Sequence, residues 1–471
     1  MDALSVCTLP QRIHMVGIGG SGLSAIARVL ATWGHDVSGS DLHESPILCE
    51  LASLGIKTYV GHAPGQINGA EMVVISSAIP ESNTEVLAAR SAHIPVLKRR
   101  QLLGQMMAGR CGVAVAGTHG KTTTTAMVSV ILERMGLSPT FVVGGIIAEL
   151  GTNARAGSGQ HFVIEADEYD GAFYGLTPQI AVVTNIEMDH PDCFRDIEDV
   201  RAAFGTFLER VPRDGHIIAC ADSPELMRLL EGRDWTAPHV VTYGTSPGAR
   251  FAVGDVVPNE RGGTDCRVIL CPKSSVSLGG GVWSRLSLAI PGRHNALNAT
   301  AALLVADLLG LDRSAAAGVL SQFRGTLRRF EAKGERAGVL VIDDYAHHPT
   351  QVRATLATAR QRFPGRRIWA VFQPHTFSRT KTLLGELATC FGAADEVIIT
   401  DIYAARAHER AIISPEELVS VIQHERVQHI SGLDQVVAYL LRHLRAGDVL
   451  LTLNAGDAYL IGERVLASLA K

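Results

Sequence analysis

Residues 113–122, VAVAGTHGKT, decide the fold of the chain. The apolar run predicts a buried strand, the glycines after it predict a tight loop, and an amphipathic helix follows. In such a loop, backbone N–H groups cradle phosphate oxygens, Lys121 neutralises β- and γ-phosphate charge, and the Thr122 hydroxyl ligates Mg²⁺. The loop is shorter than the common G-x-x-x-x-G-K-[ST] form, because Val115 stands where that form has glycine. The predicted phosphate-binding residues are Gly117, Thr118, His119, Gly120, Lys121, Thr122 and Thr123.

A second glycine-rich loop lies near the N-terminus, where residues 13–22 read IHMVGIGGSG. It has the spacing G-x-G-x-x-G between a predicted strand and a predicted helix, and Asp41 follows the next strand. Such glycines let the backbone approach a pyrophosphate at a helix N-terminus, and the acidic residue binds a ribose hydroxyl. The pattern leaves NAD, FAD and a UDP-sugar open as ligands. Its candidate residues are Gly17, Gly19, Gly20, Ser21, Gly22 and Asp41.

Polar side chains follow two further predicted strands. Glu165 ends the strand HFVI, and Asn185, Asp189 and His190 follow the strand IAVVT. Because the carboxyl ends of parallel strands meet at one edge of a sheet, we expect these groups to converge on the phosphate loop. Glu165 and His190 beside triphosphate oxygens predict a second Mg²⁺ site, although this ion usually takes oxygen ligands.

Short β-branched runs alternate with amphipathic stretches along most of the chain, which predicts an α/β fold with parallel strands. Helices are predicted over 22–33 and 122–135, each followed by a glycine at its C-terminal cap. Between residues 243 and 291 the alternation changes to period two, which predicts antiparallel strands. A third strand–helix series follows, with helices predicted over about 350–362 and 380–392. We place the domains at residues 1–107, 108–324 and 325–471.

The composition agrees with packed globular domains. The 471 residues suggest about three domains, and 43 Lys and Arg against 47 Asp and Glu give a net charge of −4. The absence of a basic excess argues against a nucleic-acid partner, and no stretch approaches the ~18 apolar residues of a membrane span. The first residues do not resemble a secretory signal, and the eight scattered cysteines form no C-x-x-C. We therefore expect a cytoplasmic protein with reduced, mostly buried thiols and no membrane partner.

Three later polar segments follow predicted strands or loops. They are GRHNALN at 292–298, DDYAHHP at 343–349 and FQPHTFSR at 372–379. The guanidinium fork of Arg379 matches a carboxylate. A histidine pair before proline is also an ordinary way to begin a helix, so these residues alone leave the role of 343–349 open.

In order and spacing, these segments resemble the Mur ligase family over nearly the whole chain. The motifs that carry the resemblance are RIHMVGIGGSGLSAIA, VSGSD, SSAI, GTHGKTTTT, EADEYD, TNIEMDH, GRHNALNA, RRFE, DDYAHHPT and FQPHTFSRT. The resemblance implies a Rossmann-like N-terminal domain for a UDP-sugar and a central P-loop ATPase domain with a parallel sheet plus a small antiparallel sheet. It also implies a Rossmann-like C-terminal domain that admits an amino acid.

Within the family, the chain is most similar to the branch that adds L-alanine. The resemblance implies ATP-dependent amide formation on the lactyl carboxylate of UDP-N-acetylmuramate, through an acyl phosphate that the amine of L-alanine attacks, with two Mg²⁺ ions. The transferring phosphoryl group and the carboxylate are both anionic, so cations must lie between them. We expect a monomer or a weak homodimer.

The resemblance also implies roles for single residues. Lys121 would hold the γ-phosphate, Thr122 one Mg²⁺, and Glu165 with His190 the second. The residues implied for the rest of the nucleotide are Asn295, Asn298 and Arg328 or Arg329. Those implied for the two other substrates are Ser76 and Ser77 for the UDP-sugar, and Tyr345, His347 and Arg379 for alanine. The implied catalytic set is Lys121, Glu165, His190, His347 and Arg379.

Three positions differ from other members of the family. Residues 189–215 contain no lysine, whereas several sister ligases carry a modified lysine there, and this agrees with the alanine-adding branch. Thr376 stands where some members have arginine, so carboxylate binding would depend on Arg379. Asn454 replaces a glycine, and asparagine tolerates a left-handed backbone.

Two alternatives remain at this point. A recycling ligase of the same family adds a whole tripeptide, and residues 165–174, EADEYDGAFY, resemble it, but its first glycine loop differs from GIGGSGLS. An NAD-dependent oxidoreductase or a non-enzymatic nucleotide-binding module would need only the first glycine loop. Neither the oxidoreductase nor the nucleotide-binding module requires the phosphate loop, the Glu165 and His190 pair, and residues 343–349 together.

Overall fold

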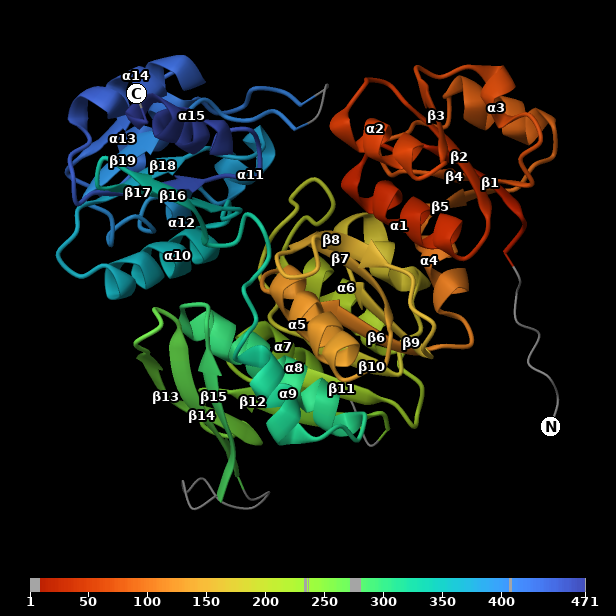
Figure 1. The fold of residues 1–471 in the computed structure, drawn as a ribbon, viewed down its shortest axis with the longest axis horizontal. Coiled ribbons are helices and arrows are strands. Elements are labelled where there is room, and N and C mark those ends of the chain that lie inside the picture. The colour runs from red at the N-terminus through yellow and green to blue at the C-terminus, as the bar shows by residue number, and fades with distance from the viewer. Residues whose placement is uncertain (1–8, 233–234, 236, 272–280, 406–408, 471) are drawn as a thin grey trace.

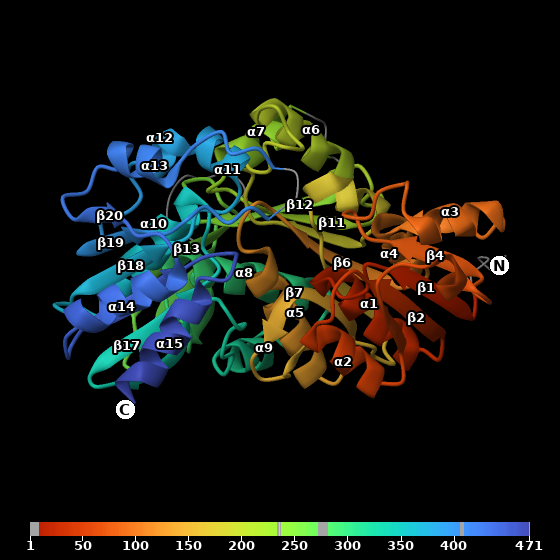
Figure 2. The ribbon, with the colours of Figure 1, turned by 90° about the horizontal axis from the view of Figure 1, so that it is seen from above.

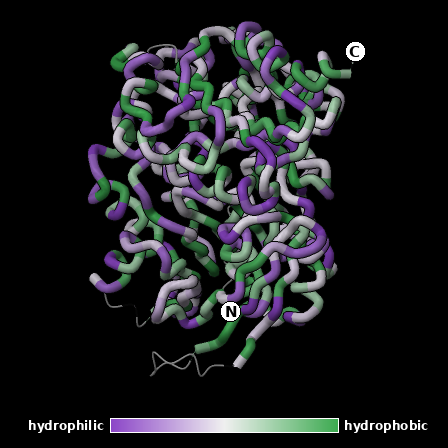
Figure 3. Tube along the Cα trace, turned by 90° about the vertical axis from the view of Figure 1, so that its left-hand side faces the viewer, coloured by the Kyte–Doolittle hydropathy of each residue, from purple (hydrophilic) through white to green (hydrophobic). Residues whose placement is uncertain are grey.

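In a computed structural model, residues 9–232, 235, 237–271, 281–405 and 409–470 are described. Their strands form three sheets that follow one another along the chain, and Figure 1 shows the three units around a common centre. Figure 3 shows hydrophobic and hydrophilic segments alternating along the trace, as expected where helices cover strands. Among these described residues, no helix is both long enough and apolar enough to cross a membrane.

The N-terminal sheet has five parallel strands in the order β3-β2-β1-β4-β5. Its elements are β1 (Arg12–Val16), α1 (Ser21–Thr32), β2 (Asp36–Asp41), α2 (Pro46–Ser53), β3 (Lys57–Val60), η1 (Pro64–Ile67), β4 (Met72–Ile75), α3 (Thr84–Ser91), β5 (Val96–Lys98) and α4 (Arg99–Met107). The strand order reverses between β1 and β4, which is where ligands bind in an open parallel sheet. The first glycine loop follows β1, and Ser76 and Ser77 follow β4, so both predicted groups lie at this switch point.

The central sheet has ten strands in the order β15-β14-β13-β12-β11-β10-β6-β9-β7-β8. Its elements are β6 (Cys111–Ala116), α5 (Lys121–Arg134), β7 (Thr140–Ile147), β8 (Thr152–Arg155), β9 (His161–Glu165), η2 (Tyr169–Gly175), β10 (Ile180–Val183), α6 (Ile197–Leu208), β11 (His216–Cys220), α7 (Pro224–Glu231), β12 (His239–Gly244), β13 (Phe251–Pro258), β14 (Thr264–Leu270), β15 (Gly281–Leu288), α8 (Arg293–Leu308) and α9 (Arg313–Leu320). Strands β13, β14 and β15 pair antiparallel, as predicted. The parallel pairing of β12 with β13 joins these three strands to the parallel part of the sheet. They therefore extend one sheet and do not form a separate one.

The C-terminal sheet has six strands in the order β16-β17-β21-β18-β19-β20. Its elements are β16 (Glu331–Arg336), β17 (Val339–Asp344), α10 (Pro349–Arg362), β18 (Ile368–Phe372), α11 (Phe377–Thr382), α12 (Leu384–Leu387), β19 (Glu396–Ile399), α13 (Pro415–Val421), β20 (Val427–His429), α14 (Leu433–His443), β21 (Val449–Leu453) and α15 (Tyr459–Leu469). All strands except the antiparallel edge strand β16 run parallel. Every residue of β18 and β21 is buried, because helices cover both faces of the sheet.

The predicted helices after the two glycine loops are confirmed, and each ends before a left-handed glycine, Gly34 (φ 93°) and Gly136 (φ 80°). The single helix predicted over 380–392 is wrong, since α11 and α12 take its place. The Thr376 hydroxyl accepts a hydrogen bond from the Arg379 N–H at 3.3 Å and so begins α11 earlier than predicted. The break falls at Leu383 (φ −96°, ψ 17°), between the two short helices.

The N-terminal and central units share one hydrophobic core, which includes Met106 of α4 and Phe173 of η2. Their elements approach closely, because a Cβ on Gly104 would lie only 2.3 Å from the carbonyl oxygen of Gly175. The C-terminal clusters contain only residues from 330 onward. Figure 2 shows the N- and C-terminal units at opposite ends of the molecule. The contact between the C-terminal and central units is therefore polar, which is typical of domains that move relative to each other.

Candidate active site

The phosphate loop joins β6 to α5 through two glycines with positive φ, 134° at Gly117 and 81° at Gly120. A Cβ on Gly117 would lie 2.0 Å from the Thr184 hydroxyl oxygen, and one on Gly120 would lie 2.7 Å from Oδ1 of Asn298. Both positions therefore require glycine on steric as well as conformational grounds.

Lys121, the first residue of α5, is fixed by a buried carboxylate. Its Nζ donates to the carbonyl oxygen of Gly117 at 2.5 Å and to the two carboxylate oxygens of Glu168 at 2.8 and 3.0 Å. Burial opposes the charged form, but Glu168, Asp167 and Glu165 outweigh it and raise the pKa of Lys121. The lysine is therefore a permanent cation at the mouth of the loop. Glu168 was not among the predicted site residues, although the motif EADEYD contains it.

Glu165 lies beside the loop at the end of β9. One oxygen accepts from the Thr122 hydroxyl at 3.0 Å and the other from the Gly144 N–H at 2.6 Å. Burial raises the pKa of Glu165, and Lys121 opposes that shift. Arg329 donates to the Thr122 hydroxyl at 3.3 Å, so a cation from outside the central sheet also reaches this point.

His190 has a left-handed backbone (φ 53°) after β10. Its Nε2 lies 3.9 Å from carboxylate oxygens of both Glu168 and Asp189, and the potential ligand atoms of His190, Asp167 and Glu168 lie within 4.8 Å of one another. Glu165 is not part of that group, so the structure does not pair Glu165 directly with His190 as the sequence predicts. Both line the same cavity of about 310 Å³.

That cavity collects most of the predicted catalytic residues. It is lined by Lys121, Glu165, His190, Tyr345, His347 and Arg379, with Ser21 and Gly22 from the first glycine loop. It therefore lies where all three units meet. Arg99 of α4 also lines it, lies 3.6 Å from Asp167, and was missed by the sequence analysis because nothing in its local pattern marks it.

The second cavity, of about 440 Å³, lies between the central and C-terminal units. Its walls include the predicted residues His119, Gly120, Thr122, Thr123, Asn295, Asn298 and Arg329. They also include Tyr243, His294 and Asp344, which were not predicted. Burial raises the pKa of Asp344 to about 6, against the pull of Arg329.

Arg328 lines neither cavity, so of the two arginines only Arg329 is placed at the predicted nucleotide site. Arg328 bonds to Asp343 at 3.1 Å and to Oδ1 of Asn454 at 2.6 Å, and it lies over the rings of Tyr345 and Tyr459. Asn454 also donates to Asp343 at 3.0 Å and is fully buried. Its backbone is not left-handed, so the suggested reason for this asparagine is wrong, and its side chain instead bridges Arg328 and Asp343.

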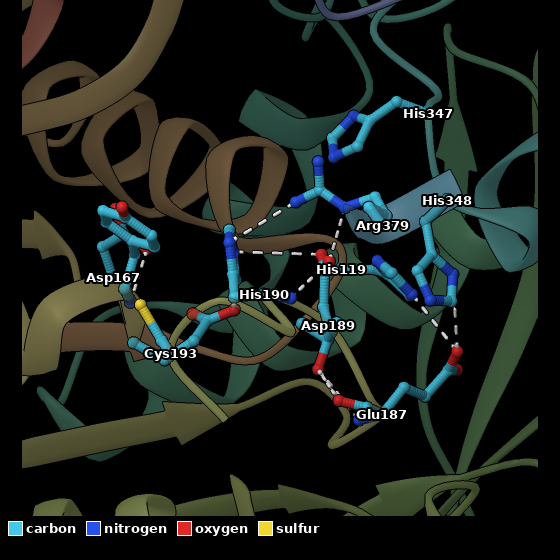
Figure 4. A network of polar contacts seen from close by, with 12 residues as sticks. His119, Asp167, Glu187, Asp189, His190, Cys193, His347, His348 and Arg379 are labelled. Carbon is cyan, nitrogen blue, oxygen red and sulfur yellow. Dashed lines mark hydrogen bonds and ion pairs between the residues drawn. The ribbon is translucent and has the colours of Figure 1, made fainter. Parts of the chain in front are cut away.

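Arg379 is buried and joins two units (Figure 4). Its Nε donates to Asp189 at 2.6 Å, and its Nη atoms lie 2.9 Å from Nδ1 of His375 and 3.4 Å from Nδ1 of His190. Burial opposes ionisation of Asp189, but Arg379 and His190 hold its pKa well below the usual range. A substrate carboxylate would therefore share this guanidinium with Asp189.

His347 lines the same cavity, and one of its ring nitrogens is held by the backbone. Its Nδ1 lies 2.8 Å from the carbonyl oxygen of Tyr345, which fixes the hydrogen on Nδ1 and leaves Nε2 with a lone pair. Burial, with Arg379 nearby, lowers the pKa of His347 well below its usual value. The ring is therefore neutral at physiological pH.

The first glycine loop has Gly17 in a left-handed conformation (φ 84°), packed against Ser76. The Gly19 N–H donates to the Asp41 carboxylate at 2.8 Å, so Asp41 braces the loop. Ser77 lines a small cavity of about 20 Å³ together with Arg99. The loop thus reaches the main cavity only at its end, through Ser21 and Gly22.

The site combines a phosphate loop, a largely buried lysine with acidic side chains around it, and an arginine from the C-terminal unit. These features define a three-domain P-loop enzyme. Three family models match the chain in succession. They are Mur ligase family, catalytic domain (residues 12–110), Mur ligase middle domain (115–306) and Mur ligase, glutamate ligase domain (328–456). The chain belongs to the Mur ligase family.

Among its relatives is a UDP-N-acetylmuramate–L-alanine ligase of Caldanaerobacter subterraneus subsp. tengcongensis, 42% identical over 97% of both chains. Another protein of that name, from Rubrobacter xylanophilus, is 43% identical over 98% of this chain and 100% of the relative. The crystal structure of a UDP-N-acetylmuramate–alanine ligase from Thermotoga maritima is 27% identical, with a TM-score of 0.77, and covers 97% of this chain and 98% of that one.

The cysteines among the described residues form no disulfide, as predicted, but the expectation that most of them are buried is wrong. The seven cysteines among the described residues are free thiols, three of them buried, and Cys7 lies outside the described residues.

Proposed function

We propose that this protein joins L-alanine to the lactyl carboxylate of UDP-N-acetylmuramate at the expense of ATP, through an acyl phosphate. One observation carries the proposal: a single cavity brings Lys121 of the phosphate loop together with His347 and Arg379 of the C-terminal unit. The two UDP-N-acetylmuramate–L-alanine ligases described above match the chain over nearly its whole length. We assign the UDP-sugar to residues 1–107, ATP to 108–324 and the amino acid to 325–471.

ATP fits the larger cavity, with its phosphates directed toward the loop. Asn295, Asn298 and Arg329 line the nucleotide side, and Lys121 lies at the phosphate end, in the neighbouring cavity. Lys121 is paired with Glu168 and would exchange part of that contact for the γ-phosphate. These groups supply positive charge and fixed donors, which is most of what phosphoryl transfer requires of a protein.

The residues present fit Mg²⁺. Thr122 and Glu165 offer hydroxyl and carboxylate oxygens 3.0 Å apart, a spacing that an octahedral ion of this size can bridge. The ligand atoms of Asp167, Glu168 and His190 form a second set within 4.8 Å of one another. We propose Thr122 with Glu165 for one ion and His190 with Asp167 and Glu168 for a second, so Glu165 serves the other ion than the one the resemblance implied. Bound Mg²⁺ would neutralise phosphate charge and orient its oxygens.

The reaction balances in two steps. A lactyl carboxylate oxygen attacks the γ-phosphorus, and ADP leaves. The alanine nitrogen then attacks the acyl carbon, the carbon–oxygen bond to phosphate breaks, and inorganic phosphate leaves. The attacking form of alanine is the uncharged amine, and Nε2 of the neutral His347 ring accepts the proton that this nitrogen loses as the amide forms. Arg379 holds the alanine carboxylate.

Acceptor specificity tests the proposal directly. With ATP and UDP-N-acetylmuramate present, we expect phosphate release to be fastest with L-alanine and slower with glycine or L-serine. One methyl group in a small pocket is worth roughly 10- to 200-fold. D-alanine should fail more completely, because inversion misplaces either the carboxylate or the attacking amine. Release of phosphate and formation of the alanyl product would be measured for each acceptor.

A murein peptide ligase of Psychrobacter arcticus has the same fold, with a TM-score of 0.70 at 24% identity. A tripeptide-adding ligase would prefer L-Ala-γ-D-Glu-diaminopimelate to free L-alanine. A preference for the tripeptide in a side-by-side assay would contradict the proposed acceptor but leave ATP use intact. Absence of phosphate release with every acceptor would contradict the proposal as a whole.

Replacing Glu165 tests the metal assignment. We expect Glu165→Gln to raise the Mg²⁺ concentration needed for half-maximal activity by about tenfold or more, since even residues behind the ligands contribute that much to metal affinity. The glutamine oxygen can still accept from the Gly144 N–H, so the local fold is retained. Mg²⁺ titrations of initial rate would be compared with Asp170→Asn, because Asp170 belongs to the same motif but faces Lys98 at 4.0 Å. An unchanged Mg²⁺ requirement would make Glu165 structural.

A further inference from the structure

Gln351 lies in the first turn of α10, where the two cavities meet. It lines both of them, and the residues that the cavities share are His119, Gly120, Thr122, Arg329 and Gln351. Of these five, Gln351 is the one supplied by a helix of the C-terminal unit. Its side chain therefore touches the space assigned to ATP and the space assigned to the acceptor.

The hydrogen bonds of Gln351 fix the orientation of its amide. Its Oε1 accepts from the backbone N–H of His347 at 3.0 Å and of His348 at 3.3 Å. Its Nε2 lies 3.0 Å from Nδ1 of His119 in the phosphate loop. An amide nitrogen only donates, so Nδ1 of His119 is the acceptor and the hydrogen of that ring is on Nε2.

The other side of His119 is also held. Its Nε2 lies 3.3 Å from a carboxylate oxygen of Glu187, and that carboxylate accepts from the Thr350 hydroxyl at 2.6 Å. His348 closes the network, since its Nε2 lies 3.2 Å from the carbonyl oxygen of Met188. Figure 4 shows the rings of His119 and His348 both directed at Glu187. Helix α10 therefore contacts this network at two residues, through the side-chain amide of Gln351 and the hydroxyl of Thr350.

The same histidine is anchored to the loop beneath it. The His119 N–H donates to Oδ1 of Asn185 at 2.8 Å, and its carbonyl oxygen accepts from Nδ2 of Asn185 at 3.1 Å. A shift of the His119 ring would therefore be transmitted to the backbone that cradles phosphate. A shift of Gln351 would likewise move the backbone of His347, the proposed proton acceptor.

We infer that Gln351 is a positioning residue, which holds the phosphate loop at His119 in register with the acceptor loop at His347. This inference rests on the proposed function. Gln351 touches neither reacting atom, but it fixes the distance between the two loops that carry the phosphoryl group and the attacking amine. A displacement of about 1 Å in such a geometry costs on the order of a hundredfold in rate.

The test compares three variants in the full-length protein. Gln351→Leu removes both hydrogen-bonding functions at similar size. Gln351→Glu keeps an oxygen for the two backbone N–H groups and a second that can accept from Nδ1 of His119 once the ring takes up a second proton there, while Nε2 still donates to Glu187. Gln361→Leu, an exposed glutamine at the other end of α10, is the matched control.

For Gln351→Leu we expect kcat to fall by about ten- to a hundredfold. The affinity for a non-hydrolysable ATP analogue, measured by calorimetry, should stay within about threefold, because Gln351 is one wall residue among many and Asn295, Asn298 and Arg329 are retained. Gln351→Glu and Gln361→Leu should keep kcat within about threefold of the unmodified protein.

Three results would overturn the inference. They are a normal kcat in Gln351→Leu, a loss of nucleotide affinity equal to the loss of kcat, and an equal loss of kcat in Gln351→Glu.

Hydrogen exchange of residues 117–123, followed without any substrate, gives a readout that does not depend on activity. Exchange should be faster in Gln351→Leu than in the unmodified protein and unchanged in Gln361→Leu. If the unmodified protein does not ligate L-alanine but exchange responds in this way, the proposed function fails while the coupling of the two loops stands. Exchange that does not respond would contradict the coupling itself.

Discussion

Lys121→Ala should lower ligation by about a thousandfold or more. The γ-phosphate and the lactyl carboxylate are both anionic, and Lys121 is the loop cation at the point where they meet. Loss of a single charge-stabilising donor in such a site costs about 10²- to 10³-fold, and loss of a full cation on a transferring phosphoryl group costs up to about 10⁵-fold. UDP-N-acetylmuramate should bind the variant almost normally, because its proposed site lies in the N-terminal unit. Ligation rates and calorimetric binding of the UDP-sugar would test both statements.

The same substitution also affects folding. Glu168 is 2% exposed, and without Lys121 its charge would be buried and unpaired. Breaking a buried pair on one side costs about 3–5 kcal/mol. The double variant Lys121→Ala/Glu168→Gln removes both charges and should recover stability in urea unfolding while remaining inactive. Activity in the double variant would show that Lys121 serves the fold and not the reaction.

The sequence predicted the convergence at the phosphate loop because the relevant residues follow parallel strands. Lys121 follows β6, Glu165 ends β9 and His190 follows β10, and these strands are neighbours in one sheet. Topology alone then brings their carboxyl ends to one edge. The sequence also predicted the antiparallel strands after β12, because the residues there alternate with period two.

The residues that the sequence missed depend on partners in another unit. Gln351 is paired with His119, and Asp189, which the sequence did place near the phosphate loop, is paired with Arg379; neither contact leaves a signal in the local pattern. The choice between neighbouring arginines was open for a similar reason. Arg328 has a left-handed backbone (φ 61°) and bonds to Asp343, whereas Arg329 faces the nucleotide cavity.

The interface between the central and C-terminal units includes these distant pairs, and no apolar cluster of the described residues spans it. Hydrogen bonds between buried polar groups require exact geometry, so such an interface specifies one docked arrangement. Its opening breaks hydrogen bonds such as those of Arg379 with Asp189 and of Gln351 with His119, which water can replace. Substrate entry and product release in a cavity formed by all three units would depend on that opening.

Arg379→Ala should reduce both alanine use and stability. The guanidinium is the group proposed to hold the alanine carboxylate, so its loss should raise the KM for L-alanine far more than the KM for ATP. It also leaves the Asp189 carboxylate buried and unpaired, which costs about 3–5 kcal/mol. Arg379→Lys should not restore alanine use, because an ammonium group lacks the fork that contacts Asp189 and a substrate carboxylate together. Steady-state kinetics and urea unfolding would be measured on each variant.

The variant Arg379→Ala/Asp189→Asn separates the two effects. Asparagine at 189 carries no charge to leave unpaired, so most of the lost stability should return, and the two substitutions should not add in the free energy of unfolding. The KM for L-alanine should stay high, since no cation remains to bind its carboxylate. If the double variant regained both stability and a normal KM, Arg379 would act only as the partner of Asp189, and the carboxylate site would have to be sought elsewhere in the cavity.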